Sequence, residues 1–352
     1  MLFRCQNCGT EFKADSRKVP NPNVKFRCIK CKVGFLVHVR EKGEASDAAT
    51  AGKTAQTAAR TSSTAAPAGP AQARLTLTKV KDLPSLPFVA TKVMELTSSP
   101  NTTMKQMEEV ILKDPALATK VLRYSNSALY GRAGQISSLT DALVLLGFST
   151  VKTIVIASSV KSMHSSRSQG YLAAGKNMWV HSVETAIAAR LFARLVDKKQ
   201  MEETFVAGLL HDIGKSIIES RLPGTGQQMM SLLKDSDETL EEIERKTLGI
   251  AHSELGAVVC KKWNFPELLE KAILYHHDPS KSKKDSNLAH IVALADAISY
   301  HLALNPAERQ DDATRVQEMP SCNILGIDSK SLAWVIEETQ TAVERDKKIF
   351  DM

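Results

Sequence analysis

The helical spacing of apolar residues, from about Val80 to the end, most constrains how this chain can fold. Residues such as Val93, Leu96, Val121 and Leu122 recur three and four positions apart, and strand-like alternation is scarce. Turn signals divide this region at Pro84, Pro87, Ser99-Pro100-Asn101, Asp114-Pro115, Tyr130-Gly131, Gly147 and Leu222-Pro223-Gly224. We therefore expect an all-α bundle of well over ten helices.

Several helix boundaries can be predicted from residues that favour helix ends. Thr102 or Thr103 can serve as the N-cap of a helix over 104–113, and Pro115 and Pro266 suit first helical positions. The tail after residue 304 begins with a polar stretch to Gln317. It ends with a predicted helix over 329–350, which either packs on the bundle or mediates dimerisation.

Composition shifts along the 352 residues, which suffice for two or three domains, predict the domain organisation. We expect a small β zinc ribbon over 1–40, a disordered linker over 41–79, a helical domain over 80–303 and a helical extension over 304–352. The helical domain divides into an N-terminal lobe over 80–170 and a second lobe over 171–303. The linker is rich in Ala, Thr and Ser and has almost no large apolar residue before Leu75, so it cannot offset its ordering entropy.

The expected compartment is the cytoplasm. No apolar run reaches the roughly 18 residues that a membrane span needs, and the first residues lack the layout of a signal peptide. Four of the six cysteines form CxxC pairs, and the other two, Cys260 and Cys322, lie far apart in sequence. Cys260 is in an apolar stretch, which favours a small core residue over a reactive thiol.

The net charge of +7 resides in the first forty residues. They carry nine Lys and Arg against two acids, and the remaining 312 residues balance at 37 against 37. Any electrostatic affinity for nucleic acid would therefore belong to the N-terminus, where four metal-bound thiolates would offset part of it. This hypothesis rests on charge alone.

The two CxxC pairs predict a zinc site. Cys5 and Cys8 are followed, after nineteen residues, by Cys28 and Cys31. Two such pairs can place four thiolates tetrahedrally about one zinc ion, which stabilises a core too small to fold alone. The segment resembles the short zinc ribbon that opens many bacterial multi-domain proteins. That resemblance implies two small hairpins and a recognition or assembly role without catalysis.

Histidines and aspartates of metal-ligand type are spread through the helical region. They are His181, His211, Asp212, His252, His276, His277 and Asp296. Imidazoles with carboxylates are the donors that divalent metals of intermediate hardness require. Asp296 lies within the apolar run Leu294–Ile298, where an unpaired carboxylate is costly and a cation would relieve it. Lys215 follows His211 by four residues, on the same side if the helix is continuous.

Each of these residues also has a structural interpretation. Asp212 could cap a helix, His277 could lie at a helix C-terminus, and Lys215 could be a solvated charge. The group as a whole favours a metal site, because seven such residues would otherwise need separate buried partners. We assign no role to the other four histidines, which are His38, His164, His290 and His301.

His181, His211-Asp212 and Asp296 resemble the H, HD and D motif of the HD superfamily of metal-dependent phosphohydrolases. Further segments resemble the helical opening of the HDOD domain, the HD-related output domain of bacterial signalling proteins. They are Leu83-Pro84-Ser85-Leu86-Pro87, residues 111–117, Ser125-Asn126-Ser127-Ala128-Leu129-Tyr130 and residues 142–147. The resemblance runs from about residue 80 to 300 and implies a two-lobed, all-helical regulatory module. Many HDOD domains have lost the HD ligands, whereas this sequence keeps them.

His252 and His276-His277 resemble the extra histidines of the HD-GYP cyclic dinucleotide phosphodiesterases, although Asp278-Pro279-Ser280 follows in place of Gly-Tyr-Pro. An active site of this kind would hold one or two divalent ions of Fe, Mn, Mg or Zn. His181, His211, Asp212 and Asp296 would bind one ion, and Asp212 would bridge to a second on His252, His276 and His277. Water activated by the metals would attack phosphorus, and Lys215 would stabilise the phosphoryl charge.

Two functional hypotheses follow. In the first, which the HDOD resemblance and the missing Gly-Tyr-Pro segment favour, the protein is a regulator that binds other signalling proteins and retains the HD metal site. In the second, it is a metal-dependent phosphohydrolase acting on a nucleotide or cyclic dinucleotide.

Overall fold

The chain divides into two compact units, Met1–Thr64 and Ala65–Met352. The computed structural model describes residues 2–4, 11–13, 23–27, 34–38, 73–74, 78–79, 83–126, 136–164, 171, 177–234, 236–282, 287–304 and 306–350. Cys5, Cys8, Cys28 and Cys31 lie outside these ranges, so zinc binding by the N-terminal segment stays a prediction. Ala73 and Arg74, inside the predicted linker, are helical, and Ala73 is buried in the helical core.

The first unit contains two antiparallel strand pairs. Strand β1 (Leu2–Arg4) pairs with β2 (Glu11–Lys13), with Phe3 opposite Phe12. Strand β3 (Asn23–Arg27) pairs with β4 (Gly34–His38), with Phe26 opposite Phe35. Each pair has the form of a small hairpin.

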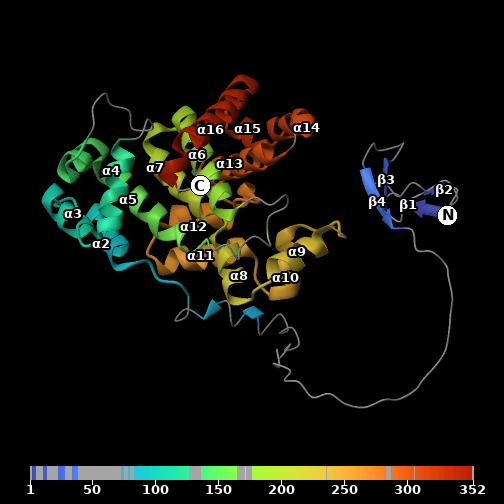
Figure 1. The fold of residues 1–352 in the computed structure, drawn as a ribbon, viewed down its shortest axis with the longest axis horizontal. Coiled ribbons are helices and arrows are strands. Elements are labelled where there is room, and N and C mark those ends of the chain that lie inside the picture. Colours follow the sequence, from blue (N-terminus) through green and yellow to red (C-terminus); the bar gives the residue numbers. More distant parts are fainter. Residues whose placement is uncertain are drawn as a thin grey trace, which may run out of the picture. The chain divides into compact units, whose positions relative to one another are not determined.

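The described part of the second unit is all helical, as expected (Figure 1). Its first lobe contains α2 (Phe88–Ser98), α3 (Met104–Ile111), α4 (Pro115–Ser125) and α5 (Leu139–Lys161). The second lobe contains α6 (Met178–Val196), α7 (Met201–Leu210), α8 (Ile213–Arg221), α9 (Thr225–Lys234), α10 (Leu240–Leu248), α11 (His252–Lys262), α12 (Glu267–Leu274) and α13 (Leu288–Ala303), with 3-10 turns η5 (Lys198–Gln200) and η6 (Pro279–Lys281). The extension contains α14 (Pro306–Gln317), α15 (Pro320–Leu325) and α16 (Ser329–Phe350).

The N-terminal lobe follows the predicted boundaries closely. Thr103 caps α3 through a capping box with Gln106, and Asp114 caps α4 ahead of Pro115. Helix α5 kinks at Gly147, whose φ of +72° is a conformation that L side chains rarely adopt. The turn signal at Gly147 therefore becomes a bend inside one long helix.

Helix α5 is also the one described helix that is long and apolar enough to cross a membrane. In its most apolar window, 61% is buried against the rest of the protein.

The final helix packs on the bundle, as one of the two expectations held. Leu332, Val335 and Val343 are buried, and Phe350 contacts the rings of Tyr124 and Phe205. The polar stretch up to Gln317, inside the predicted helical extension, forms α14. Few apolar residues mark it in the sequence, and tertiary contacts stabilise it: the Arg309 guanidinium donates to the carbonyls of Leu302 and Leu304.

The two lobes share a continuous hydrophobic core. The segment before α2 is held against α11, because Lys262 Nζ donates to the Leu83 carbonyl at 2.7 Å and Trp263 Nε1 to the Pro84 carbonyl at 2.9 Å. Helix α6 lies at the centre of the second lobe, in contact with α7, α13 and α16 (Figure 1). This packing directs one face of α6 toward the candidate site.

Candidate metal centre

The first three ligand candidates come from α6 and from the break between α7 and α8. His181 lies in the first turn of α6 and is 2% exposed. Helix α7 ends at Leu210, and α8 begins at Ile213, so His211 and Asp212 form the turn between them. The condition that the helix is continuous from His211 to Lys215 is therefore not met, and the break directs both turn residues into the protein.

The next three candidates lie at helix ends rather than within helices. His252 is the first residue of α11. Helix α12 ends at Leu274, and His276 and His277 follow it in a turn. The predicted helix start at Pro266 was one residue early, since Pro266 is the N-cap of α12.

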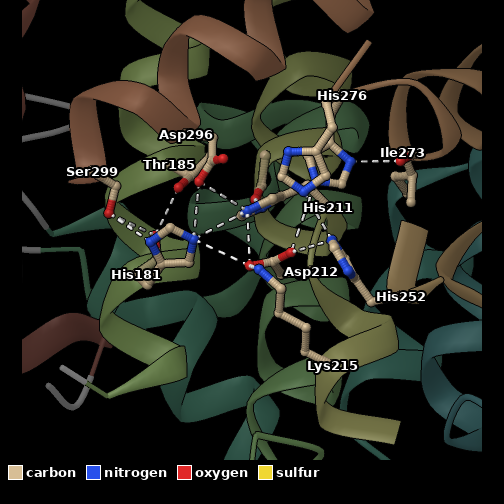
Figure 2. A network of polar contacts seen from close by, with 12 residues as sticks. His181, Thr185, His211, Asp212, Lys215, His252, Ile273, His276, Asp296 and Ser299 are labelled. Atoms are coloured by element: carbon tan, nitrogen blue, oxygen red, sulfur yellow. Dashed lines mark hydrogen bonds and ion pairs between the residues drawn. The ribbon is translucent and has the colours of Figure 1, made fainter. Parts of the chain in front are cut away.

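Four side chains converge in a first group, which Figure 2 shows around Asp212. The Nε2 atoms of His181 and His211 lie 3.1 Å apart, and each is 3.3 Å from Asp212 Oδ2. Asp296, from α13, brings Oδ1 to 3.2 Å from His181 Nε2 and 3.4 Å from His211 Nε2. The structure therefore places these four predicted residues together.

A second group meets the first on the other oxygen of Asp212. His252 Nε2 is 3.4 Å from Asp212 Oδ1, and His276 Nε2 is 3.9 Å from it. His277 Nε2 lies 3.0 Å from His252 Nε2. One ligand atom from each of these four residues lies within 4.8 Å of the others, which is close enough for a single ion to reach them all.

Two of the histidines are oriented by buried carboxylates. His181 Nδ1 donates to Ser299 Oγ at 2.9 Å, and Ser299 Oγ donates in turn to Glu184 Oε2 at 2.7 Å. His252 Nδ1 lies 2.7 Å from Glu244 Oε2. These contacts fix the ring orientation and turn each Nε2 toward Asp212, as outer contacts do for metal-binding histidines.

The other two buried histidines are oriented by the backbone. His211 Nδ1 lies 2.7 Å from the Gly208 carbonyl, and His276 Nδ1 lies 2.7 Å from the Ile273 carbonyl. Because a carbonyl only accepts, Nδ1 must carry the hydrogen in both rings. Neutral rings of this kind present an Nε2 lone pair to the cluster.

Lone pairs and carboxylate oxygens therefore face one another in a buried site. Among the described residues, Asp212 Oδ1, His276 Nε2 and Asp296 Oδ1 are buried without a hydrogen-bond partner. An arrangement of facing acceptors is unfavourable in a low-dielectric interior unless a cation or a proton lies between them.

The electrostatics of the cluster reflect this need for positive charge. Burial lowers the pKa of His211, but the carboxylates of Asp212 and Asp296 outweigh burial and raise that pKa to about 10. Burial also lowers the pKa of His276 well below its usual value, with further lowering from His277 and His211. A proton on His211 thus occupies the place that a metal could take, whereas His276 stays neutral.

Lys215 forms a buried ion pair with Asp212. Its Nζ lies 2.7 Å from Asp212 Oδ2, and its side chain is 6% exposed. Burial would raise the pKa of Asp212, but His211 and Lys215 outweigh burial and hold that pKa well below its usual value. Lys215 therefore helps to keep Asp212 ionised and is not a solvated surface charge.

The residues to which we assigned no role have other partners. His164 contacts Ser216, His290 contacts Ser321, and His301 contacts Asp312. His38 lies in strand β4, away from the helical unit in sequence. Cys260 and Cys322 are buried, and burial raises the pKa of both thiols, which agrees with a packing role for Cys260.

Sequence reasoning missed Glu184, Ser299 and Glu244. Glu184 follows His181 by three residues within an apolar helix, so the argument applied to Asp296 could have found it. Glu244 is fully buried, but it lies in a strongly charged segment that gives no such signal.

The fold and this His/Asp cluster define an all-α domain with a site of metal-ligand type. The sequence profile of the HDOD domain matches residues 83–279, more than half of the chain. The chain belongs to the HDOD family.

Solved structures share this fold. A protein from Shewanella amazonensis SB2B, named as a candidate phosphohydrolase, is 27% identical, with a TM-score of 0.62 over 78% of this chain and 97% of its own. An HDOD domain protein of unknown function from Geobacter sulfurreducens is 25% identical, with a TM-score of 0.60 over 80% of this chain and 97% of its own.

Two curated relatives match shorter parts of this chain. An uncharacterised Treponema pallidum protein is 22% identical over 219 residues, 62% of this chain and 42% of that protein. Ribonuclease Y of Mycoplasma mycoides subsp. mycoides SC is 31% identical over 125 residues, 36% of this chain and 19% of that enzyme. The chain thus spans less than half the length of either relative.

Proposed function

We propose that this HDOD protein is a metal-dependent phosphoester hydrolase within a signalling system. The observation that carries the proposal is the sharing of Asp212 by two groups of ligand atoms. One carboxylate oxygen faces His181 and His211, and the other faces His252 and His276. A carboxylate shared in this way is suited to bridging two metal ions.

The residues present fit such a metal pair. The buried, unpaired Asp212 Oδ1, His276 Nε2 and Asp296 Oδ1 would each gain a cation. One ion would be held by His181, His211, Asp212 and Asp296, and the other by Asp212, His252, His276 and His277. Five imidazoles favour Fe, Mn or Zn over the oxygen-preferring Mg.

Bound metals would supply a Lewis acid for the phosphoryl group and lower the pKa of a nearby water. The chain itself would contribute the remaining functions. Lys215 would hold Asp212 ionised and add positive charge where phosphoryl oxygens develop negative charge. His277 is exposed and Asp296 is 15% exposed, whereas His211 and His252 are fully buried, so a substrate would approach past the first two.

The comparisons support a phosphodiester or phosphomonoester as the substrate class. One structural relative is named as a candidate phosphohydrolase, and a partial sequence relative is a ribonuclease. Asp278-Pro279-Ser280 follows His277 here, so a cyclic dinucleotide is one substrate to test among others.

The test begins with metal-free protein reloaded with Mn²⁺, Fe²⁺ or Zn²⁺ and assayed against cyclic dinucleotides, nucleotides and bis(p-nitrophenyl) phosphate. We expect metal-dependent turnover that the substitution His252→Ala abolishes. His290→Ala is the matched control, because His290 contacts Ser321 and lies outside the cluster. Absence of turnover with every metal would reject the proposal.

A second candidate function is regulation by binding another signalling protein, with the metal site serving to hold the fold. It is favoured by apolar side chains exposed on the N-terminal lobe: Phe88 is 67% exposed and Leu112 is 56% exposed. The combined substitution of His211→Ala and Asp212→Ala separates the two. If the folded variant keeps the cellular phenotype, interaction is the function, and if it loses the phenotype, the chemistry is required.

A further inference from the structure

The cluster of histidine and aspartate side chains is enclosed on most sides, and one side reaches solvent. His181, His211, His252 and His276 are between 0% and 2% exposed. Exposure is greater at His277, on the turn after α12, and at two positions of α13, Asp296 and Tyr300. Helix α13 contacts both α12 and η6, so these exposed residues flank the same region.

Tyr300 is the aromatic residue at this opening. It follows Asp296 by four residues on α13, so the two side chains lie on one face, one helical turn apart. Its ring centroid is 6.1 Å from that of His181, and the two rings meet edge to face at 81°. Tyr300 is nevertheless 43% exposed, and no described residue forms a hydrogen bond with its hydroxyl.

A purely structural role does not account for this placement. His181 is already oriented by Ser299 at its Nδ1 and faces Asp212 and Asp296 at its Nε2. Tyr300 nevertheless keeps 43% of its surface exposed, although burying an aromatic side chain is favourable. An exposed ring beside a phosphoester site is a surface on which a planar group can stack.

We propose that Tyr300 is a specificity-determining residue, whose ring stacks on the base of a nucleotide that binds with its phosphate at the metal centre. This inference rests on the proposed function, and it narrows the substrate class to phosphoesters that carry a nucleobase. A phosphate held beside Asp296 directs its ester substituent either toward Tyr300 or toward His277. Because the imidazole of His277 would be held by the second ion, Tyr300 is the residue of the two whose aromatic face suits stacking on a base.

The test measures binding, so that it does not depend on turnover. Calorimetry on the metal-loaded full chain compares adenosine 5′-monophosphate with inorganic phosphate, for wild type, Tyr300→Ala and Tyr300→Phe. Removing a stacking partner typically costs about 1–3 kcal/mol per base, or roughly 5- to 150-fold in affinity. We expect Tyr300→Ala to weaken nucleotide binding at least fivefold, to leave phosphate binding within twofold, and Tyr300→Phe to bind both ligands like wild type.

Phe88→Ala, which removes an exposed ring from the other lobe, should change neither affinity. Equal losses for nucleotide and phosphate in Tyr300→Ala, or no loss at all, would overturn the inference. The inference also fails if wild type binds the nucleotide no more tightly than phosphate. Absence of turnover in wild type would reject the proposed hydrolase but leave this binding comparison intact.

Discussion

Replacing Gly214 with alanine should remove one metal ion from the centre and leave the other. Gly214 lies in the first turn of α8, where the helix crosses the start of α11. A Cβ atom there would lie 1.9 Å from the His252 carbonyl oxygen and 2.7 Å from its carbonyl carbon. Both are backbone atoms, so no side-chain rotation can relieve the clash.

The size of the required movement follows from these distances. Real Cβ contacts essentially never fall below 3.0 Å, so the His252 backbone must withdraw by at least about 1.1 Å. Metal–ligand bonds tolerate deviations of about 0.2 Å, so His252 would leave the coordination range of the second ion. His181, His211 and Asp296 do not depend on α11 and should keep the first ion.

Overpacking of this kind costs about 1–3 kcal/mol, which lowers the melting temperature by roughly 2–12 °C in a domain of this size. Helix propensity acts in the opposite direction, because alanine is favoured over glycine by about 1 kcal/mol in a helix interior. A lower stability of Gly214→Ala would therefore result from the clash with the His252 backbone and not from a change in helix propensity.

The assay is metal stoichiometry by mass spectrometry together with thermal unfolding. Gly256→Ala is the matched control on α11, because its Cβ would lie closest to the side-chain Cγ2 atoms of Ile273 at 3.0 Å and Ile213 at 3.5 Å, and the nearest backbone atom, the Gly214 nitrogen, is at an ordinary 3.8 Å. We expect Gly256→Ala to keep both ions. Should Gly214→Ala unfold altogether, His252→Ala tests the same loss without the clash. A folded Gly214→Ala protein that retains two ions and wild-type stability would refute the reasoning.

Three further predictions concern the contacts that support the site. Ser299→Ala removes the acceptor of His181 Nδ1 and should weaken metal affinity by roughly 10- to 100-fold in competition titrations, whereas Ser216→Ala, which removes the analogous contact to His164, should not. In metal-free protein, Asp212 and Asp296 raise the pKa of His211 to about 10, above its unfolded value. Protonated His211 therefore stabilises the folded state fully below about pH 6.5, and this contribution to the free energy of unfolding is lost as the pH rises toward 10. Melting temperatures measured from pH 6.5 to 10 should show this decline, and a decline of equal size in His211→Gln would contradict the assignment. Cys8→Ser should lower the zinc content of the full chain by one ion and leave turnover unchanged, and unaltered zinc content would argue against the ribbon.

Much of the fold could be predicted because its signals are local. The spacing of Leu332, Val335 and Val343 alone predicted the final helix, and its packing buries those residues. Asp114 and Pro115 predicted the start of α4, because capping and the fixed φ of proline act within one turn. Helix α14 lies inside the predicted helical extension, but its contacts with the end of α13 could not be predicted, because they lie outside its own sequence pattern.

In the candidate site, the residue types could be predicted from the sequence, whereas their orientation and supporting contacts could not. The residue types at His181, His211, Asp212 and Asp296 carry their chemistry in the sequence, because imidazole and carboxylate donors are costly in an apolar helix without a purpose. The orientation of these side chains could not be predicted in the same way, because the helix breaks after Leu210 and Lys215 contacts Asp212, the N-cap of its own helix, rather than lying beside His211. The supporting contacts of Glu244 were likewise invisible, since its partner His252 lies on a different helix.

By itself, the sequence determined an all-α domain and the identity of the side chains available for metal binding, because helix periodicity and donor chemistry are properties of the chain itself. The family resemblance predicted that Asp212 is shared by two ligand groups, but only the tertiary structure decided which oxygen faces which group and that their open side is flanked by Tyr300. Those facts depend on how α6, α8, α11 and α13 pack, and packing is set by shape complementarity among residues far apart in sequence.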